Sequence, residues 1–184
     1  MARIGILGVA HLHVDSYIAN LRVSGADVVG VFDRDLERCS WWGASNGVKV
    51  FRDVGSLIAE GLDGVIVCAE TLYHPELVDM AASAGLAVLC EKPIGVSVGD
   101  SHAIVDTCRN NGVHLMTALP TRLNPAVRQV RDMVREGDVG RVSAVLGANQ
   151  VVVPVDEGAW GAEQWRAGGS EGREQGGRQR GRGG

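Results

Sequence analysis

A charged pair and a proline end the apolar run Val88–Pro93, and Lys92 within it is the first candidate for chemistry. The chain has two lysines, Lys49 and Lys92, so a lysine directly after a predicted buried strand calls for a functional explanation. An ammonium at such a strand end can hydrogen-bond both a substrate hydroxyl and a coenzyme ribose. It can also stabilise the alkoxide that develops as a hydride leaves. Glu91 is placed to pair with it. The simpler alternative is a solvated surface lysine.

A glycine turn at Gly8 follows the first apolar run and precedes a stretch with helical spacing. Such a turn lets backbone N–H groups and the positive end of a helix face a pyrophosphate, and Gly5 and Ala10 are predicted to belong to the same site. The match to the pattern G-x-G-x-x-G is imperfect, because Ala10 and His13 stand where the second and third glycines belong. The alternative is a turn that binds no ligand.

Asp33 lies about 25 residues beyond Gly8, just past the second predicted strand. A carboxylate at that position can accept hydrogen bonds from both ribose hydroxyls of NAD. The neighbouring Arg34 is placed to lie against the adenine or to meet a 2′-phosphate. We therefore expect NAD or NADP as the cofactor, with NAD favoured. The alternative is that Asp33 caps the next helix.

His11 and His13 form an H-x-H pair at the end of the first predicted strand, a spacing that metal-dependent hydrolases also use on barrel strands. The chain is too short for an eight-stranded barrel, and no obvious third and fourth ligand follows. We therefore expect no metal, and predict that His11 contacts the cofactor or serves as a histidine at a helix entry. His74 is predicted either to line the cofactor pocket or to begin a helix.

Composition limits the class of protein. A chain of 184 residues with 45% hydrophobic content suits one well-buried domain with part of a second. The net charge of −4 argues against nucleic acid or an anionic membrane as the main partner.

No apolar run approaches the roughly 20 residues that span a bilayer, and no signal-peptide pattern begins the chain, so a cytoplasmic location is predicted. The cysteines show no C-x-x-C pairing and are expected to be reduced and structural: Cys39, Cys68, Cys90 and Cys108.

Short β-branched runs alternate with segments of helical spacing along the first 120 residues. This pattern predicts an α/β fold with a Rossmann-type, doubly wound parallel sheet. The predicted strands are Ile4–Val9, Val28–Phe32, Val48–Phe51, Val65–Cys68, Ala87–Cys90 and Val113–Thr117.

The connections carry recognisable helix signals. An apolar stripe at helical spacing, formed by Val14, Tyr17, Ile18 and Leu21, predicts a first helix packed on the sheet. Proline after His74 and after Asn124 marks the start of a helix. Glycines are predicted to end helices at Gly85, Gly112 and Gly137.

In these residues the chain resembles the Gfo/Idh/MocA (glucose-fructose oxidoreductase and inositol dehydrogenase) family, nucleotide-dependent oxidoreductases that act mainly on sugars and cyclitols. The resemblance implies that Lys92 is catalytic, contacting substrate and nicotinamide, and that the Gly8 turn and Asp33 hold the dinucleotide. Departures at Ala10, His13 and Glu70 affect cofactor preference and pocket shape more than the fold. The matching segments are Gly5–Gly8, Asp33–Arg34, Val67–Cys68 with His74, Ala84–Gly85, Cys90–Pro93, Gly112–Val113, Arg122–Pro125 and Gly137–Val142.

The expected domain organisation is a nucleotide-binding domain over 1–120, a connecting helix and first strand of a substrate domain over 121–160, and a disordered Gly/Arg-rich tail over 161–184. The resemblance implies a substrate domain that supplies a catalytic histidine, but no histidine follows His114. We expect a truncation, with Val142–Val153 as the first strand of that domain. A genuine tail that binds RNA loosely is the alternative.

The sequence therefore predicts the nucleotide-binding part of an oxidoreductase that passes a hydride between nicotinamide and a sugar- or cyclitol-like hydroxyl, inactive alone. The alternative is a catalytically silent dinucleotide-binding module that acts through a partner protein. A lone strand at Val142–Val153 would leave an unpaired edge, so we also expect a poorly soluble or homo-oligomeric chain.

Overall fold

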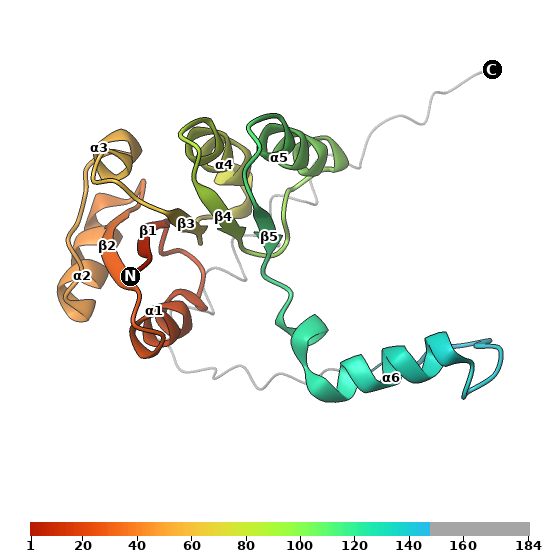
Figure 1. Cartoon of the computed structure of the whole chain (residues 1–184). Coiled ribbons are helices and arrows are strands. Elements are labelled where there is room, and N and C mark those ends of the chain that lie inside the picture. The colour runs from red at the N-terminus through yellow and green to blue at the C-terminus, as the bar shows by residue number, and fades with distance from the viewer. Residues whose placement is uncertain (148–184) are drawn as a thin grey trace, which may run out of the picture. The chain divides into compact units, whose positions relative to one another are not determined.

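Five short runs pair in parallel and form one sheet in the order β2-β1-β3-β4-β5 (Figure 1). The computed structural model describes residues 1–147. Strand order reverses between β1 and β3, and ligands of such sheets bind at the carboxyl ends beside that reversal. The strands are β1 (Arg3–Leu7), β2 (Asp27–Phe32), β3 (Gly64–Val67), β4 (Ala87–Cys90) and β5 (Leu115–Thr117).

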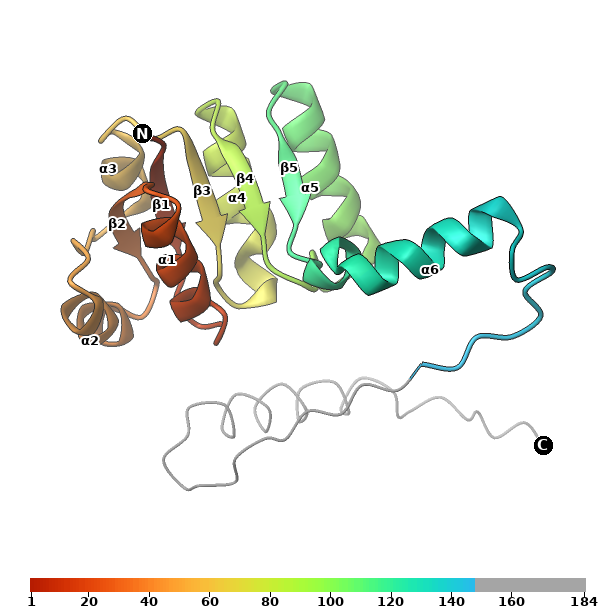
Figure 2. The ribbon, with the colours of Figure 1, turned by 60° about the horizontal axis from the view of Figure 1, so that its bottom comes forward.

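Helices cover both faces of the sheet, which confirms the doubly wound α/β prediction (Figures 1 and 2). Helices α1 (Val14–Val23) and α2 (Leu36–Asn46) pack on one face. The opposite face is covered by α3 (Val54–Ile58), α4 (His74–Ser83) and α5 (Val98–Asn110). The remaining elements are the 3-10 turns η1 (Thr71–Tyr73) and η2 (Pro120–Leu123), and helix α6 (Pro125–Glu136) beyond β5.

Each face of the sheet has its own apolar core. Under α1 and α2, Ile6, Ile18 and Val31 are fully buried. Under α3, α4 and α5, Leu57 and Leu77 are fully buried as well. Burying a side chain of this size contributes about 1.5–3 kcal/mol. The two cores hold the strands in register, and so fix where their carboxyl ends lie.

The predicted helix boundaries are confirmed. Helix α1 buries Val14 and Ile18 of the predicted stripe. Helix α4 begins at His74 with proline in its first turn, and Asn124 caps α6, where proline follows. The predicted helix-ending glycines take positive φ: 78° at Gly85, 67° at Gly112 and 85° at Gly137.

One predicted strand is reduced to a single bridge. Within Val48–Phe51, Val50 pairs with Val31 on the outer edge of β2, through backbone bonds to Lys49 and Phe51. Counting this segment as a strand gives the order 3-2-1-4-5-6, which is typical of dinucleotide-binding sheets. The segment is short and lies at an edge with a partner on one side, so it forms one bridge rather than a ladder.

The chain divides into two units, residues 1–138 and 139–184, and the first contains the sheet. Of the predicted strand Val142–Val153, residues 142–147 form no strand, and the rest lies outside the described residues. The predicted tail over 161–184 lies outside them entirely. Among the described residues, no helix is both long and apolar enough to cross a bilayer.

Candidate functional site

The chemistry-bearing residues gather at the carboxyl edge of the sheet, because the strands are parallel and their following loops share that edge. The Gly8 turn follows β1, Asp33 follows β2 and Glu70 follows β3. Glu91 and Lys92 follow β4. The parallel topology therefore brings these residues to one edge of the sheet.

The Gly8 turn requires glycine for two reasons. Gly8 has a φ of +90°, which L side chains rarely adopt. A Cβ at this position would also lie 2.3 Å from the Cα of Ala69, so the loop after β3 packs directly on the turn. Gly5 differs, because it lies inside β1, where a Cβ would come within 2.7 Å of Leu62 Cδ1. Ala10 is buried in the turn, and α1 begins at Val14 with no side-chain cap.

Asp33 is 1% exposed and is held by three donors of its own chain. Its Oδ2 accepts from the Val9 N–H at 2.6 Å, which ties the Gly8 turn to the end of β2. Its Oδ1 accepts from the Asp35 N–H at 2.8 Å and from Arg38 Nη2 at 2.7 Å. A carboxylate offers about four acceptor positions, so one on Oδ2 is unused by these bonds. Asp35, rather than Asp33, caps α2.

Arg38 links Asp33 to the loop after β3. Its Nη2 also lies 2.8 Å from Glu70 Oε1, and its side chain is 11% exposed. Burial lowers the pKa of Arg38, but hydrogen bonds to Asp33 and Glu70 outweigh burial and raise it. The guanidinium therefore shares its charge between two carboxylates through Nη2, and its buried Nε has no partner among the described residues.

Arg34 lines a neighbouring pocket of about 420 Å³ that also includes Asp33, Arg52, Glu76 and Met80. The Arg34 guanidinium lies 4.2 Å from the ring centroid of Tyr73 and pairs with Glu76. The pocket thus joins a buried carboxylate, two guanidinium groups and apolar surface. These groups are complementary to a ribose that is joined to a flat aromatic base.

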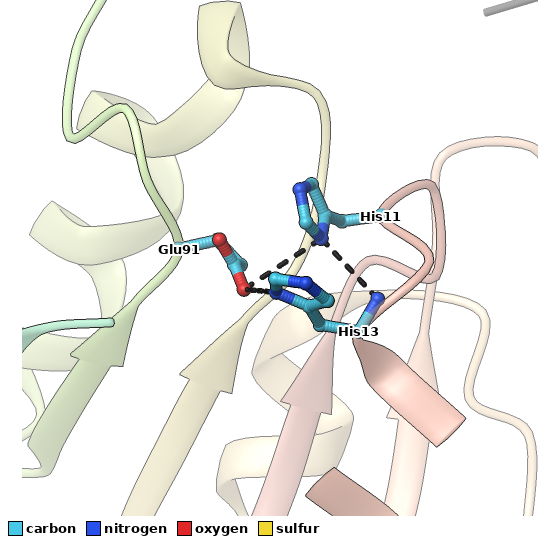
Figure 3. A group of neighbouring side chains, drawn as sticks. All are labelled: His11, His13 and Glu91. Atoms are coloured by element: carbon cyan, nitrogen blue, oxygen red, sulfur yellow. Dashed lines mark hydrogen bonds and ion pairs between the residues drawn. The ribbon is translucent and has the colours of Figure 1, made fainter. Parts of the chain in front are cut away.

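A second cluster surrounds Glu91, which is 1% exposed (Figure 3). Its Oε1 lies 2.7 Å from His13 Nδ1 and 3.6 Å from His11 Nδ1. The Tyr17 hydroxyl donates to the same oxygen at 2.6 Å, and the Lys92 backbone N–H donates to Oε2 at 2.7 Å. The turn after β1 and the end of β4 are therefore joined through one carboxylate. The Lys92–Pro93 peptide bond that follows is cis.

The charges of this cluster are set by burial and by hydrogen bonds. Burial raises the pKa of Glu91, but hydrogen bonds from Tyr17 and His13 outweigh burial and lower it. Burial is also the largest cause of the lowered pKa of His11, and the positive charge of Lys92 adds to it. Burial and the bond to Glu91 raise the pKa of Tyr17. At neutral pH, Glu91 is therefore a buried carboxylate beside a neutral His11.

Two contacts compete for the protons of His11. The His13 backbone N–H points at His11 Nδ1 at 3.3 Å, which requires a lone pair there. A neutral ring then carries its hydrogen on Nε2. Lys92 Nζ lies 3.1 Å from that Nε2, where an ammonium and an N–H group would both be donors. The ring satisfies one contact at a time, so the exposed Lys92 is free to turn toward a ligand.

His74 is 1% exposed, and both of its ring nitrogens face groups of the chain itself. Nε2 lies 3.0 Å from the Ala69 carbonyl, and Nδ1 lies 3.2 Å from the Ile94 carbonyl and 3.4 Å from Cys90 Sγ. The ring therefore ties the loop after β3 to the segment after β4. Direct contact of His74 with a cofactor stays a prediction.

Sequence reasoning missed two residues of the site. The apolar spacing predicts Tyr17 as part of the stripe of α1, but its hydroxyl reaches Glu91. No sequence pattern singles out Arg38, because an arginine in a helix is usually solvated. A tyrosine in a buried stripe carries a polar group that needs a partner, and that signal could have identified Tyr17.

The fold, together with the residues at the carboxyl edge of its sheet, defines a class of protein. A glycine turn leads to an uncapped helix start, a carboxylate follows the second strand, and the sheet reverses its order between β1 and β3. Those features describe a Rossmann-type dinucleotide-binding domain. The chain belongs to the GFO_IDH_MocA family, described as an oxidoreductase family with an NAD-binding Rossmann fold, which it matches over residues 2–119.

Individual relatives agree with this assignment. The chain is 35% identical over 120 residues to D-apiose dehydrogenase of Paraburkholderia graminis, covering 64% of this chain and 32% of the relative. It is 32% identical over 171 residues to 1,5-anhydro-D-fructose reductase of Ensifer adhaerens, covering 92% of this chain and 51% of the relative. The crystal structure of the WlbA dehydrogenase of Bordetella pertussis with NADH and UDP-GlcNAcA superposes with a TM-score of 0.69 at 25% identity, covering 76% of this chain and 41% of that one. The chain thus spans about half or less of the length of these relatives.

Proposed function

We propose that this chain is the coenzyme-binding part of an NAD(P)-dependent oxidoreductase that passes a hydride between nicotinamide and a hydroxyl-bearing carbon of a sugar- or cyclitol-like substrate. The observation that carries the proposal is the position of Lys92. It stands at the carboxyl end of β4, next to the Gly8 turn, with its Nζ within 3.1 Å of His11. The nicotinamide supplies the hydride chemistry when it is bound, and the protein supplies position and charge.

The residues present suit a dinucleotide. The start of α1 carries no side-chain cap, so its N–H groups can meet a pyrophosphate. Asp33 keeps an acceptor position on Oδ2 for a ribose hydroxyl, and Arg38 Nε is a buried donor in need of a partner. The pocket beside Arg34 takes the adenosine end in this proposal. Gly8 and Ala10 shape the turn, and His11 borders the nicotinamide side.

NAD is the favoured coenzyme. Arg38 forms ion pairs with both Asp33 and Glu70. Two carboxylates therefore face one guanidinium at the place where a 2′-phosphate would lie in this proposal. A phosphate there would meet an excess of negative charge. Arg34 is likewise paired with Glu76. These pairs favour two ribose hydroxyls over a phosphate.

Lys92 acts on the substrate in this proposal. Its ammonium hydrogen-bonds the reacting hydroxyl and stabilises the alkoxide character that develops as the hydride leaves. Glu91 holds the Lys92 backbone N–H, so it positions this residue without contacting the substrate. The names of the relatives, a D-apiose dehydrogenase and a 1,5-anhydro-D-fructose reductase, support a sugar or polyol as the substrate class.

Residues 1–120 hold the coenzyme in this proposal, and turnover depends on a substrate domain that begins beyond them. The chain spans 51% of the length of the reductase relative and 32% of the dehydrogenase relative, and coenzyme binding without turnover by these 184 residues alone stays part of the proposal. A silent module that acts through a partner protein is the second candidate. A cytoplasmic location and self-association stay predictions of the sequence.

The test is calorimetric titration of the 184-residue chain with NADH and NADPH. We expect NADH to bind more tightly than NADPH, and Asp33→Ala to weaken binding at least tenfold. Lys92→Ala should weaken NADH binding, whereas Lys49→Ala, at the other lysine, should leave it unchanged. Hydride transfer to a sugar or polyol by the isolated chain would exclude the silent-module candidate. Absence of binding to either coenzyme would refute the proposal.

A further inference from the structure

The turn after β1 and the end of β4 bring together three side chains that the sequence separates. His13 and Glu91 are 78 positions apart in the chain, yet their side chains touch. One ligand-type atom from each of His11, His13 and Glu91 lies within 4.8 Å of the others (Figure 3). The H-x-H pair lacked a third partner in the sequence, and the fold supplies Glu91 as that partner.

The distances suit a metal ion. A tetrahedral Zn²⁺ with bonds of about 2.0–2.2 Å holds neighbouring ligand atoms roughly 3–3.5 Å apart. Two of the three separations, 2.7 Å from Glu91 Oε1 to His13 Nδ1 and 3.6 Å to His11 Nδ1, bracket that range, and the third is within 4.8 Å. Both imidazoles turn the same ring nitrogen toward the same oxygen. We propose that His11, His13 and Glu91 form a binding site for a divalent transition-metal ion.

Two imidazoles and a carboxylate select the class of ion. This donor set suits Zn²⁺, Fe²⁺ and other divalent transition-metal ions, whereas Mg²⁺ and Ca²⁺ prefer oxygen ligands alone. The contact from the His13 N–H fits a His11 ring whose Nδ1 carries the lone pair that a metal ligand requires, and a bound ion would take the place of that N–H. His13 Nδ1 would exchange its hydrogen bond to Glu91 for a bond to the metal.

The surroundings provide support and access. Tyr17 and the Lys92 backbone N–H hold the buried Glu91 carboxylate, and such supporting bonds orient ligands in metal sites. The His11 and His13 side chains are 21% and 35% exposed, so solvent or a substrate oxygen can reach a fourth position. An ion here would stand beside Lys92. Its action on a substrate hydroxyl rests on the proposed function, but metal binding itself does not.

Lys92 opposes the ion. Its Nζ lies 3.1 Å from His11 Nε2, and a ring bound to metal through Nδ1 keeps its hydrogen on Nε2. The ammonium must then turn away, and its charge repels the cation. Removing this charge should therefore tighten metal binding, which is the opposite of the effect expected for a ligand.

The experiment is titration of the chelator-treated full chain with Zn²⁺ by calorimetry, with Co²⁺ absorption as a report on ligand geometry and no coenzyme present. We expect one equivalent of Zn²⁺ and no binding of Mg²⁺. His13→Ala and Glu91→Gln should each weaken Zn²⁺ at least tenfold, and Lys92→Met should strengthen it several-fold. His102→Ala and His114→Ala, at exposed histidines, serve as matched controls.

The proposal is overturned if Zn²⁺ binds the His13→Ala chain as tightly as the original chain, or if a control variant causes the loss. Circular dichroism checks that each variant is folded. If Glu91→Gln fails to fold, His11→Ala replaces it, because that side chain is partly exposed. Zn²⁺ binding without NADH binding would refute the proposed function and leave the metal site standing. The reverse result would refute the metal site alone.

Discussion

In the proposed function, Arg38 is the residue on which coenzyme choice depends most directly. Its guanidinium is shared by Asp33 and Glu70, so its charge is neutralised at the position that the proposal gives to a 2′-phosphate. In Glu70→Gln, one of these carboxylates becomes a neutral amide, so more of the positive charge of Arg38 is left for an anion. We expect NADPH binding to improve roughly tenfold relative to NADH, which is about 1.4 kcal/mol. The ratio of the two dissociation constants, measured by calorimetry, is the readout.

The matched control for this prediction is Glu37→Gln, which removes the same charge from an exposed position in the first turn of α2. Its NADPH-to-NADH ratio should equal that of the original chain. An unchanged ratio in Glu70→Gln, with both coenzymes still bound, would show that Glu70 does not set the preference.

Gly8 and Gly25 separate backbone strain from steric clash. Both have positive φ, 90° and 75°, but a Cβ at Gly8 would lie 2.3 Å from Ala69 Cα, whereas nothing lies within 4 Å of a Cβ at Gly25. Gly25→Ala should lower the free energy of unfolding by about 1 kcal/mol, the left-handed cost alone. Gly8→Ala should cost more, because the loop after β3 must move. Urea denaturation checks both, and equal losses would contradict the close contact.

At the scale of the element, α5 depends on its first turn. The Ser97 hydroxyl accepts from the Asp100 N–H at 3.1 Å, and the Asp100 carboxylate accepts from the Ser97 N–H at 3.0 Å. We expect Ser97→Ala to lower the free energy of unfolding by about 1 kcal/mol, because the helix loses its cap. Ser45→Ala, in α2, removes a hydroxyl that contacts a helix carbonyl and should be nearly neutral. A loss of equal size in both variants would argue against the cap.

Strand positions were predictable because parallel strands buried on both faces read as apolar runs. Val65–Cys68 and Ala87–Cys90 predicted β3 and β4 to within a residue or two. The segment Val48–Phe51 is also rich in β-branched and aromatic residues, with one lysine among them, but forms one bridge, at Val50. Composition describes what a segment can do, whereas strand length depends on how many partners the fold provides.

At the scale of the whole molecule, the edge that carries the site was predictable and the contacts within it were not. Parallel topology dictates that Gly8, Asp33 and Lys92 share the carboxyl edge. Nothing in the local sequence indicates that His13 meets Glu91 across an intervening strand, because that contact depends on the length and path of the turn after β1. The same holds for Arg38, whose partners follow two different strands.

The prediction of reduced, structural cysteines agrees with the fold, which buries all four thiols without a disulfide. Burial, reinforced by the Asp33 charge, raises the pKa of Cys39 to about 11. We therefore expect the native chain to resist Ellman's reagent at pH 8 and to release all four thiols in guanidinium. Ser40→Cys, at an exposed position of α2, should add one thiol that reacts at once. Rapid reaction of the native chain would show that its core opens readily.

Because of these buried thiols, the free energy of unfolding is expected to fall at alkaline pH. Burial, then the charge of Glu91, raises the pKa of Cys90 to about 12 from an ordinary 9.0. Above pH 9 the unfolded chain loses this proton while the folded chain keeps it, so stability is complete below pH 9 and falls as pH rises toward 12. At pH 10 the loss in the free energy of unfolding from one such thiol is about 1.4 kcal/mol.

Urea unfolding at pH 8 and pH 10 should thus show a smaller loss in the free energy of unfolding for Cys90→Ala than for the original chain. Val78→Ala creates a cavity without removing a thiol, so it should keep the full loss. An equal pH dependence in Cys90→Ala would mean that the thiol ionises alike in both states.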